Sequence, residues 1–179
     1  MWYAGGVVLL GAALLKSLPT AHSCSYPCVP GSEDIMKPKE HGTSHVPVQD
    51  NLRWGCNGKT ADKICNFNRH YAEFSGYWET TTFKQDVKGK KQEKFYDSNT
   101  GKLLLHGPVD RTWDDWMKES SNHGWPSFRD NEVNWDNVRV LPNGETVSVD
   151  GTHLGHNLPD RKGNRYCLNL VSIAGNPKN

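Results

Sequence analysis

The sequence has almost no excess of charge of either sign. Its 21 lysine and arginine residues nearly balance 20 aspartate and glutamate residues, which leaves a formal net charge of +1. Nucleic acids and anionic membranes are recognised largely through clustered positive charge. The balance therefore gives no electrostatic reason to expect either partner. No internal repeat is visible, and 179 residues suit one domain or one domain with an extension.

Long apolar runs are absent after residue 15. The one such run, AGGVVLLGAALL at 4–15, is too short to span a bilayer comfortably. Small residues at Ala21 and Ser23 follow it, which is the layout of a secretory signal peptide cleaved before Cys24. No basic residue precedes the run, which is unusual for a signal peptide, and a membrane anchor is the alternative for an apolar run of this length. We predict a signal peptide at 1–23 and a secreted or secretory-lumen protein with no membrane association after cleavage.

Cysteine is scarce and unevenly placed. Four of the five cysteines (Cys24, Cys28, Cys56 and Cys65) lie within the first 65 residues, and Cys167 stands alone. In an oxidising compartment four cysteines can pair in three ways, and one remains. The short spacings favour local Cys24–Cys28 and Cys56–Cys65 bridges, which leave Cys167 as a free thiol. That thiol is either a buried, inert small hydrophobe or a nucleophile.

Proline and polar residues dominate 24–63, so we predict an irregular extension there and a compact domain at 64–179. Within the domain, Thr112 and Asp115 resemble a helix capping box, and a Pro-Asn-Gly turn separates two alternating β-branched runs. The expected elements are a strand at 70–83 broken near Gly76, a hairpin formed by 94–97 and 101–107, a helix at 112–121, a hairpin at 137–151 and a last strand at 165–173. These predict a mainly β domain with one or two short helices.

The last strand presents a polar face. With a period of two, Arg165, Cys167 and Asn169 point to one side, and Tyr166 and Leu168 point to the core. A thiol reacts as its thiolate, and a neighbouring cation such as Arg165 lowers its pKa. The amide of Asn169 can donate a hydrogen bond to a polarised oxygen.

Two further segments carry groups suited to the same chemistry. THLGHN supplies His153 and His156, one of which can act as a general acid while the other orients it or holds a water. HGWPSF supplies Trp125 and Phe128, whose rings suit the wall of a small apolar pocket. The pair of histidines could equally be structural, and it lacks the further ligands that zinc needs.

Together, GWPSF, HLGH and GNRYCLN, in this order, resemble the signature of the methionine-R-sulfoxide reductases, the MsrB or SelR family. The resemblance covers about 70–175 and does not cover 24–64. It implies an MsrB-like (Mss4-like) fold of two antiparallel β-sheets. It also implies that Cys167 attacks the sulfoxide sulfur, that Trp125 packs on the substrate methyl group, and that Arg165 helps to hold the thiolate. His153, His156 and Asn169 would bind and protonate the sulfoxide oxygen.

The sequence departs from the family in two places. Many members bind a structural zinc through two C-x-x-C pairs, and the matching residues here are Asp97, Thr100, Val147 and Asp150. We therefore expect no zinc. The position before GWPSF, where a resolving cysteine often stands, is His123, so we expect no cofactor other than an external thiol reductant such as thioredoxin or a thioredoxin-like protein.

The sequence thus predicts a secreted, monomeric peptide-methionine (R)-S-oxide reductase that acts on oxidised methionine in peptides and proteins through a sulfenic acid on Cys167. The alternative is a secreted, non-catalytic binding module on the same scaffold. A Cys-His hydrolase is weaker, because nothing in the sequence resembles an orienting acid and an oxyanion-hole turn.

Overall fold

A computed structural model describes residues 24–178, so the predicted signal peptide lies outside the described residues. The strands form two antiparallel sheets, which confirms the predicted class. The smaller sheet pairs β1 (Glu93–Tyr96) with β2 (Leu103–Gly107). The larger sheet has the order β3-β7-β6-β5-β4 and consists of β3 (Ser127–Phe128), β4 (Val138–Val140), β5 (Glu145–Ser148), β6 (His153–Asn157) and β7 (Tyr166–Leu168).

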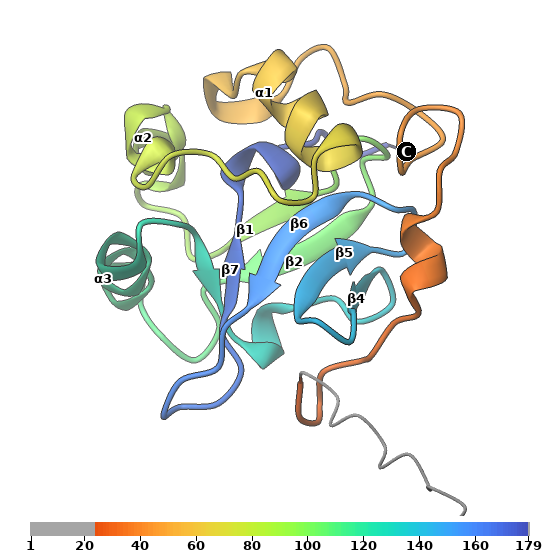
Figure 1. The fold of residues 1–179 in the computed structure, drawn as a ribbon. Helices are drawn as coiled ribbons and strands as arrows, with labels where there is room; N and C mark the ends of the chain where they lie inside the picture. Colours follow the sequence, from red (N-terminus) through yellow and green to blue (C-terminus); the bar gives the residue numbers. More distant parts are fainter. Residues whose placement is uncertain (1–23, 179) are drawn as a thin grey trace, which may run out of the picture.

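The helices are short and lie around the sheets (Figure 1). They are α1 (Gly58–Asp62), α2 (Phe83–Val87) and α3 (Trp113–His123), the π-helical turn η3 (Lys63–Phe67), and the 3-10 turns η1 (Glu33–Met36), η2 (Arg53–Gly55), η4 (Tyr77–Thr80), η5 (Asp130–Glu132) and η6 (Leu170–Ser172). Helix α3 starts at the predicted capping box of Thr112 and Asp115. Across 24–178, no helix combines the length and apolarity needed to cross a bilayer.

Both predicted hairpins are present, as β1–β2 and β4–β5. The predicted strand at 70–83 is wrong: that segment is irregular and then forms η4 and the start of α2. The last strand is shorter than predicted and ends at Leu168. Beyond it the amides of Leu170 and Val171 donate to the buried carboxylate of Glu73 rather than to a neighbouring strand, and the chain turns into η6.

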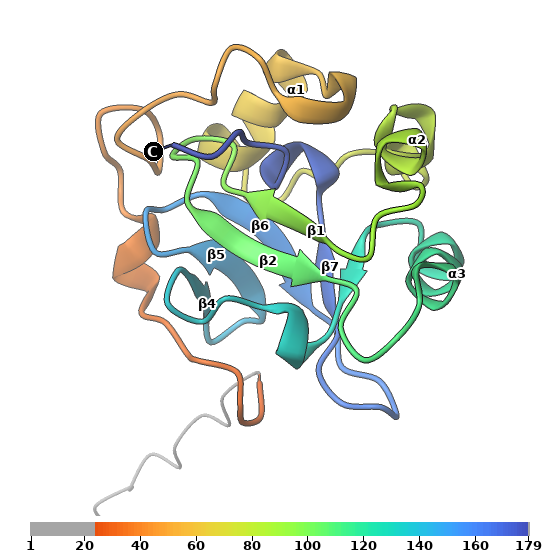
Figure 2. The ribbon, with the colours of Figure 1, turned by 180° about the vertical axis from the view of Figure 1, so that it is seen from behind.

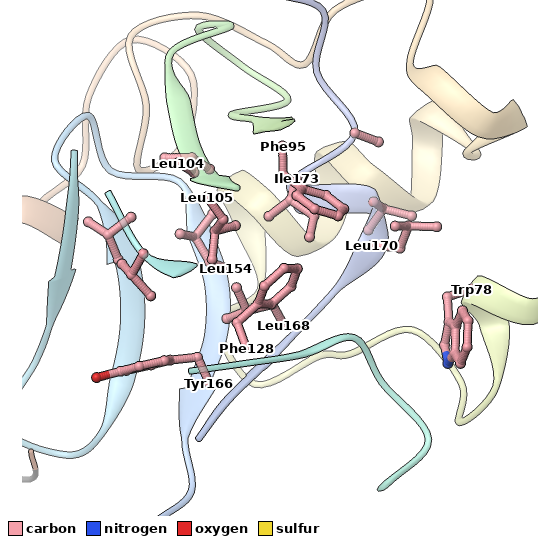
Figure 3. Packing of buried hydrophobic residues seen from close by; sticks show 14 of the residues in the cluster. Trp78, Phe95, Leu104, Leu105, Phe128, Leu154, Tyr166, Leu168, Leu170 and Ile173 are labelled. Atoms are coloured by element: carbon pink, nitrogen blue, oxygen red, sulfur yellow. The ribbon is translucent and has the colours of Figure 1, made fainter. Parts of the chain in front are cut away.

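The core lies between the two sheets. Figure 2 shows the β1–β2 hairpin stacked over the larger sheet, and Figure 3 shows the side chains that fill the gap. Tyr166, Leu168 and Leu170 are fully buried, as the alternation predicted. The other labelled side chains of this core include Phe95, Leu104 and Leu105 from the smaller sheet and Phe128 and Leu154 from the larger sheet.

The N-terminal segment 24–63 is irregular, as predicted, but it belongs to the same core. The ring of Trp54 packs on Phe83 and Phe95, with centroids 5.0 and 5.7 Å apart. Backbone hydrogen bonds join Val29 and Gly31 to Val140, so the segment extends the β4 edge of the larger sheet. Such pairing covers an edge that would otherwise expose unpaired backbone groups.

The cysteines pair only in part as expected. Cys24 and Cys28 form a disulfide. The predicted Cys56–Cys65 bridge is wrong, because both are free, buried thiols. Cys65 is fully buried with its sulfur 3.5 Å from the Ser172 hydroxyl, and Cys56 belongs to the hydrophobic core. Packing rather than sequence spacing therefore determines their state.

Candidate active site

Cys167 lies at the centre of β7, between β3 and β6. Its register partners are Ser127 on β3 and His156 on β6. Residues directly opposite one another in an antiparallel pair share a face of the sheet, so the thiol, the hydroxyl and the imidazole lie together. Gly155 allows this close pairing, because a Cβ there would overlap the carbonyl group of Cys167.

A pocket of about 380 Å³ opens over the Cys167 side of β6 and β7. The connection from η3 to α2, yellow in Figure 1, passes across β6 and β7 and supplies one wall of the pocket through residues 69–72. The predicted residues that line the pocket come from three separate parts of the sequence: Trp125, His153, His156, Cys167 and Asn169. Tertiary structure thus brings together most of the predicted set.

A larger cavity of about 830 Å³ lies beside α3. Several charged side chains in its lining form ion pairs with one another: Arg111 and Arg129 both bind Glu119, and Arg129 also binds Asp160. It contains no cysteine, and both of its arginines are already paired with carboxylates. We therefore place the candidate site at the smaller pocket.

Phe128 lies away from this pocket. Its register partner is Tyr166, and its ring is fully buried against Phe95 and Trp116, at centroid distances of 5.0 and 5.6 Å. Because side chains alternate along a strand, Ser127 takes the Cys167 face and Phe128 the core face. The structure therefore assigns Phe128 to the core, instead of the pocket wall that we expected.

Arg165 is buried beside Cys167 and does not line the pocket. Burial raises the pKa of the Cys167 thiol above its ordinary value, while the charge of Arg165 and a hydrogen bond from it oppose that effect. Burial outweighs Arg165, so the pKa of the thiol is raised on balance. Arg165 still acts in the predicted direction, since it makes the thiolate less costly than burial alone would.

The two histidines differ in their partners. His153 is almost fully buried, and its Nδ1 lies 2.8 Å from an oxygen of Glu145, which is also buried. The rings of His153 and His156 are 5.7 Å apart. Burial and then the charge of His153 lower the pKa of His156. His156 therefore favours the neutral imidazole near pH 7.

Asn169 and Trp125 are held by the backbone of one residue, Glu73. The Glu73 amide donates to the Asn169 side-chain oxygen at 3.1 Å, and the Glu73 carbonyl accepts from the Trp125 indole at 3.0 Å. The Asn169 amide also donates to the Leu154 carbonyl at 3.1 Å. One amide hydrogen of Asn169 remains for a ligand.

Glu73 was missed in the sequence because it lies in the segment interpreted as a strand. It is 3% exposed, and burial raises its pKa to about 7 although the Leu170 and Val171 amides donate to it. Glu145 and its partner Arg69 were also missed. Their side chains meet across 76 residues of sequence, so no local pattern could have indicated the pair.

The two aspartates at the positions of the family's C-x-x-C pairs are engaged with their neighbours. Asp97 is fully buried, accepts from the Asn99 amide at 2.8 Å and from the Thr152 hydroxyl at 2.9 Å, and thereby ties the β1–β2 turn to the β5–β6 turn. Asp150 pairs with Lys102 at 2.9 Å. Among residues 24–178, no three His, Cys, Asp or Glu side chains are grouped as a metal site would need. The expected lack of zinc stays a prediction.

Comparison of the chain with protein-family models, with curated proteins and with solved structures finds no match.

Proposed function

We propose that the protein is a secreted methionine-R-sulfoxide reductase that acts on oxidised methionine in peptides and proteins through Cys167. The observation that supports this most is that one pocket gathers Trp125, the two histidines, Cys167 and Asn169. These residues belong to the three motifs that resemble the MsrB signature. The pocket volume of about 380 Å³ falls in the range of small-molecule sites and suits one side chain.

The chemistry needs a thiolate and an acid side by side. The Cys167 sulfur attacks the sulfoxide sulfur, an imidazolium protonates the sulfoxide oxygen, and the oxygen passes to Cys167. The products are methionine and a sulfenic acid on Cys167, so the sulfoxide is reduced by two electrons and the thiol is oxidised by two. Trp125 offers an apolar face to the methyl group, and the free amide hydrogen of Asn169 suits the oxygen.

A second thiol must then reduce the sulfenic acid, and we propose an external one. Cys56 and Cys65 are both buried, and neither lines the pocket that contains Cys167. Cys24 and Cys28 are joined to each other. A thioredoxin or a similar dithiol protein fits this requirement.

One observation favours a second candidate. The Glu145 carboxylate on His153 provides the orienting acid that the sequence had not indicated, and an acid, an imidazole and a thiol are also the groups of a Cys-His hydrolase. The two activities differ in product, because a hydrolase releases an acid and leaves a sulfoxide unchanged. A non-catalytic binding module would do neither.

The deciding experiment is an assay of the purified protein with dithiothreitol and each epimer of a methionine sulfoxide peptide. We expect reduction of the R epimer only. Cys167→Ser should abolish it, because a serine hydroxyl is hardly ionised at neutral pH. Cys56→Ser is the matched control and should keep most of the activity. Reduction of neither epimer would favour the binding module, and cleavage of a thioester without reduction would favour the hydrolase.

A further inference from the structure

The Glu145 carboxylate is buried beneath the pocket with two strong partners. It is buried, and one oxygen lies 2.8 Å from Nδ1 of His153. Both oxygens accept from Arg69, whose Nε lies 3.0 and 3.1 Å from them. Burial favours the neutral acid, but these hydrogen bonds outweigh it and lower the pKa of Glu145. The carboxylate is therefore charged at neutral pH.

Arg69 in turn binds a residue of the N-terminal segment. Its second terminal nitrogen lies 2.5 Å from a carboxylate oxygen of Glu33, in η1. The exposed fractions of the three side chains fall from 58% for Glu33 to 26% for Arg69 and 3% for Glu145. A continuous chain of charged groups thus runs from the surface of the N-terminal segment to His153 in the pocket.

We propose that Glu145 is a positioning residue that makes His153, rather than His156, the proton donor to the sulfoxide oxygen, and that Arg69 and Glu33 hold Glu145 for this task. This inference rests on the proposed reductase function. A ring that donates from Nδ1 to a carboxylate has Nε2 left to carry and deliver a proton, and the carboxylate stabilises the imidazolium. His156 has its register partner in Cys167 and favours the neutral form.

The titratable and charged groups around this pair bear on any pH profile. They are Glu145 beside His153, Arg69 beside Glu145, and His70, His156 and Cys167 at the pocket. Glu145→Gln keeps the size and an acceptor oxygen and removes only the charge. A change in the pH profile of this variant can therefore be attributed to the lost charge, because the other titratable groups stay in place.

The test is a single-turnover measurement of R-sulfoxide reduction by the full-length mature protein between pH 5 and 9. For Glu145→Gln we expect a rate about 10- to 100-fold lower with KM little changed, as for the loss of a charge-assisted hydrogen bond. We also expect the pH of half-maximal rate on the alkaline side to move lower, because the imidazolium is less stabilised. Glu145→Asp should recover part of the rate.

The matched control is Glu93→Gln, which removes a buried carboxylate from Arg53 on a separate part of the fold. It should change stability and leave both rate and pH profile unaltered. Glu33→Gln, at the exposed end of the chain of charges, should lower the rate by only about two- to fivefold, with a shift in the same direction.

Wild-type rate and pH profile in folded Glu145→Gln would overturn the inference while the reductase function stands. A loss of rate in proportion to the unfolded fraction, with no change in pH profile, would also overturn it, since that is a merely structural effect. Absence of reduction in the wild type itself would instead reject the proposed function.

Discussion

A single buried residue, Glu73, organises the pocket from behind. Its backbone holds Trp125 and Asn169, and its carboxylate accepts from the two amides that begin η6. Burial raises the pKa of its carboxyl to about 7, so the group carries a proton in a large part of the molecules at neutral pH. A charge on Glu73 also opposes ionisation of Cys167.

The raised pKa predicts how stability depends on pH. Above the ordinary carboxyl pKa of 4.5 the unfolded chain releases this proton, whereas the folded protein keeps it up to about pH 7. The folded state therefore binds more protons in this window, and stability falls as the pH rises from 4.5 to 7. A shift of this size corresponds to an upper bound of about 3 kcal/mol.

We expect Glu73→Gln to remove this part of the pH dependence. Denaturant unfolding at pH 4.5 and 7.5 should show the wild type losing stability relative to the variant as the pH rises. Glu79→Gln is the control, because hydrogen bonds from Ser121 and Lys84 lower the pKa of that exposed carboxyl and its contribution has the opposite sign. A constant difference between wild type and Glu73→Gln at both pH values would contradict the prediction.

At the scale of elements, the end of α3 sets the position of Trp125. The helix closes at Gly124, whose φ of 88° is left-handed, and the indole follows directly. Ser120 on α3 accepts from the Ser127 amide at 3.0 Å, which fixes the start of β3. The turn between α3 and β3 is therefore fixed by the helix end on one side and by the Ser120–Ser127 hydrogen bond on the other. Gly124, in this turn, lies against the Ser75 side chain.

Gly124→Ala should be costly for two separate reasons. Alanine at a left-handed φ costs about 1 kcal/mol, and the added Cβ would overlap the Ser75 side chain. Gly89 is the matched control: its φ is 78°, and a Cβ there would meet nothing within 4 Å. We expect Gly124→Ala to lower the unfolding free energy by at least about 1 kcal/mol more than Gly89→Ala, and to raise KM through the displaced indole.

Ser75→Gly in the Gly124→Ala background separates the overlap from the backbone strain. It should remove the extra destabilisation, so that Gly124→Ala then costs about as much as Gly89→Ala. Equal destabilisation by Gly124→Ala and Gly89→Ala would show that the contact with Ser75 contributes nothing.

At the scale of the whole molecule, the N-terminal segment and the sheets share one core, and two free thiols lie inside it. Cys65 has no exposed surface. Cys56 is buried in the same hydrophobic core as Trp54, which also belongs to the N-terminal segment. An internal disulfide to Cys167 would require these thiols to leave the core. The packing of the whole chain thus favours reduction of Cys167 by another molecule.

Peptide mapping after one equivalent of R-sulfoxide, without reductant, tests this. We expect a sulfenic acid on Cys167 that dimedone traps, free thiols at Cys56 and Cys65, and an intact Cys24–Cys28 bridge. Cys167→Ser is the control and should form no dimedone adduct. A disulfide between Cys167 and either buried cysteine would contradict this expectation. It would show that the core opens during turnover and that an internal thiol, rather than an external one, attacks the sulfenic acid first.

The sequence by itself determined the features that depend on near neighbours. Alternation with a period of two placed Tyr166 and Leu168 in the core and Cys167 on the opposite face, and local turn and capping chemistry located both hairpins and α3. The polar side chains of the pocket were identifiable for the same reason, since each motif is a short continuous stretch.

Only the tertiary structure decided which groups those side chains meet. Glu73, Glu145 and Arg69 are ordinary charged residues in the sequence, and they become site residues because folding places them against partners 76 to 98 positions away. The same holds for Cys56 and Cys65, which are close in the chain and remain unbridged. Burial changes the protonation of a carboxyl or thiol through the loss of water around it, and that loss depends on the packing of the whole chain rather than on neighbouring residues.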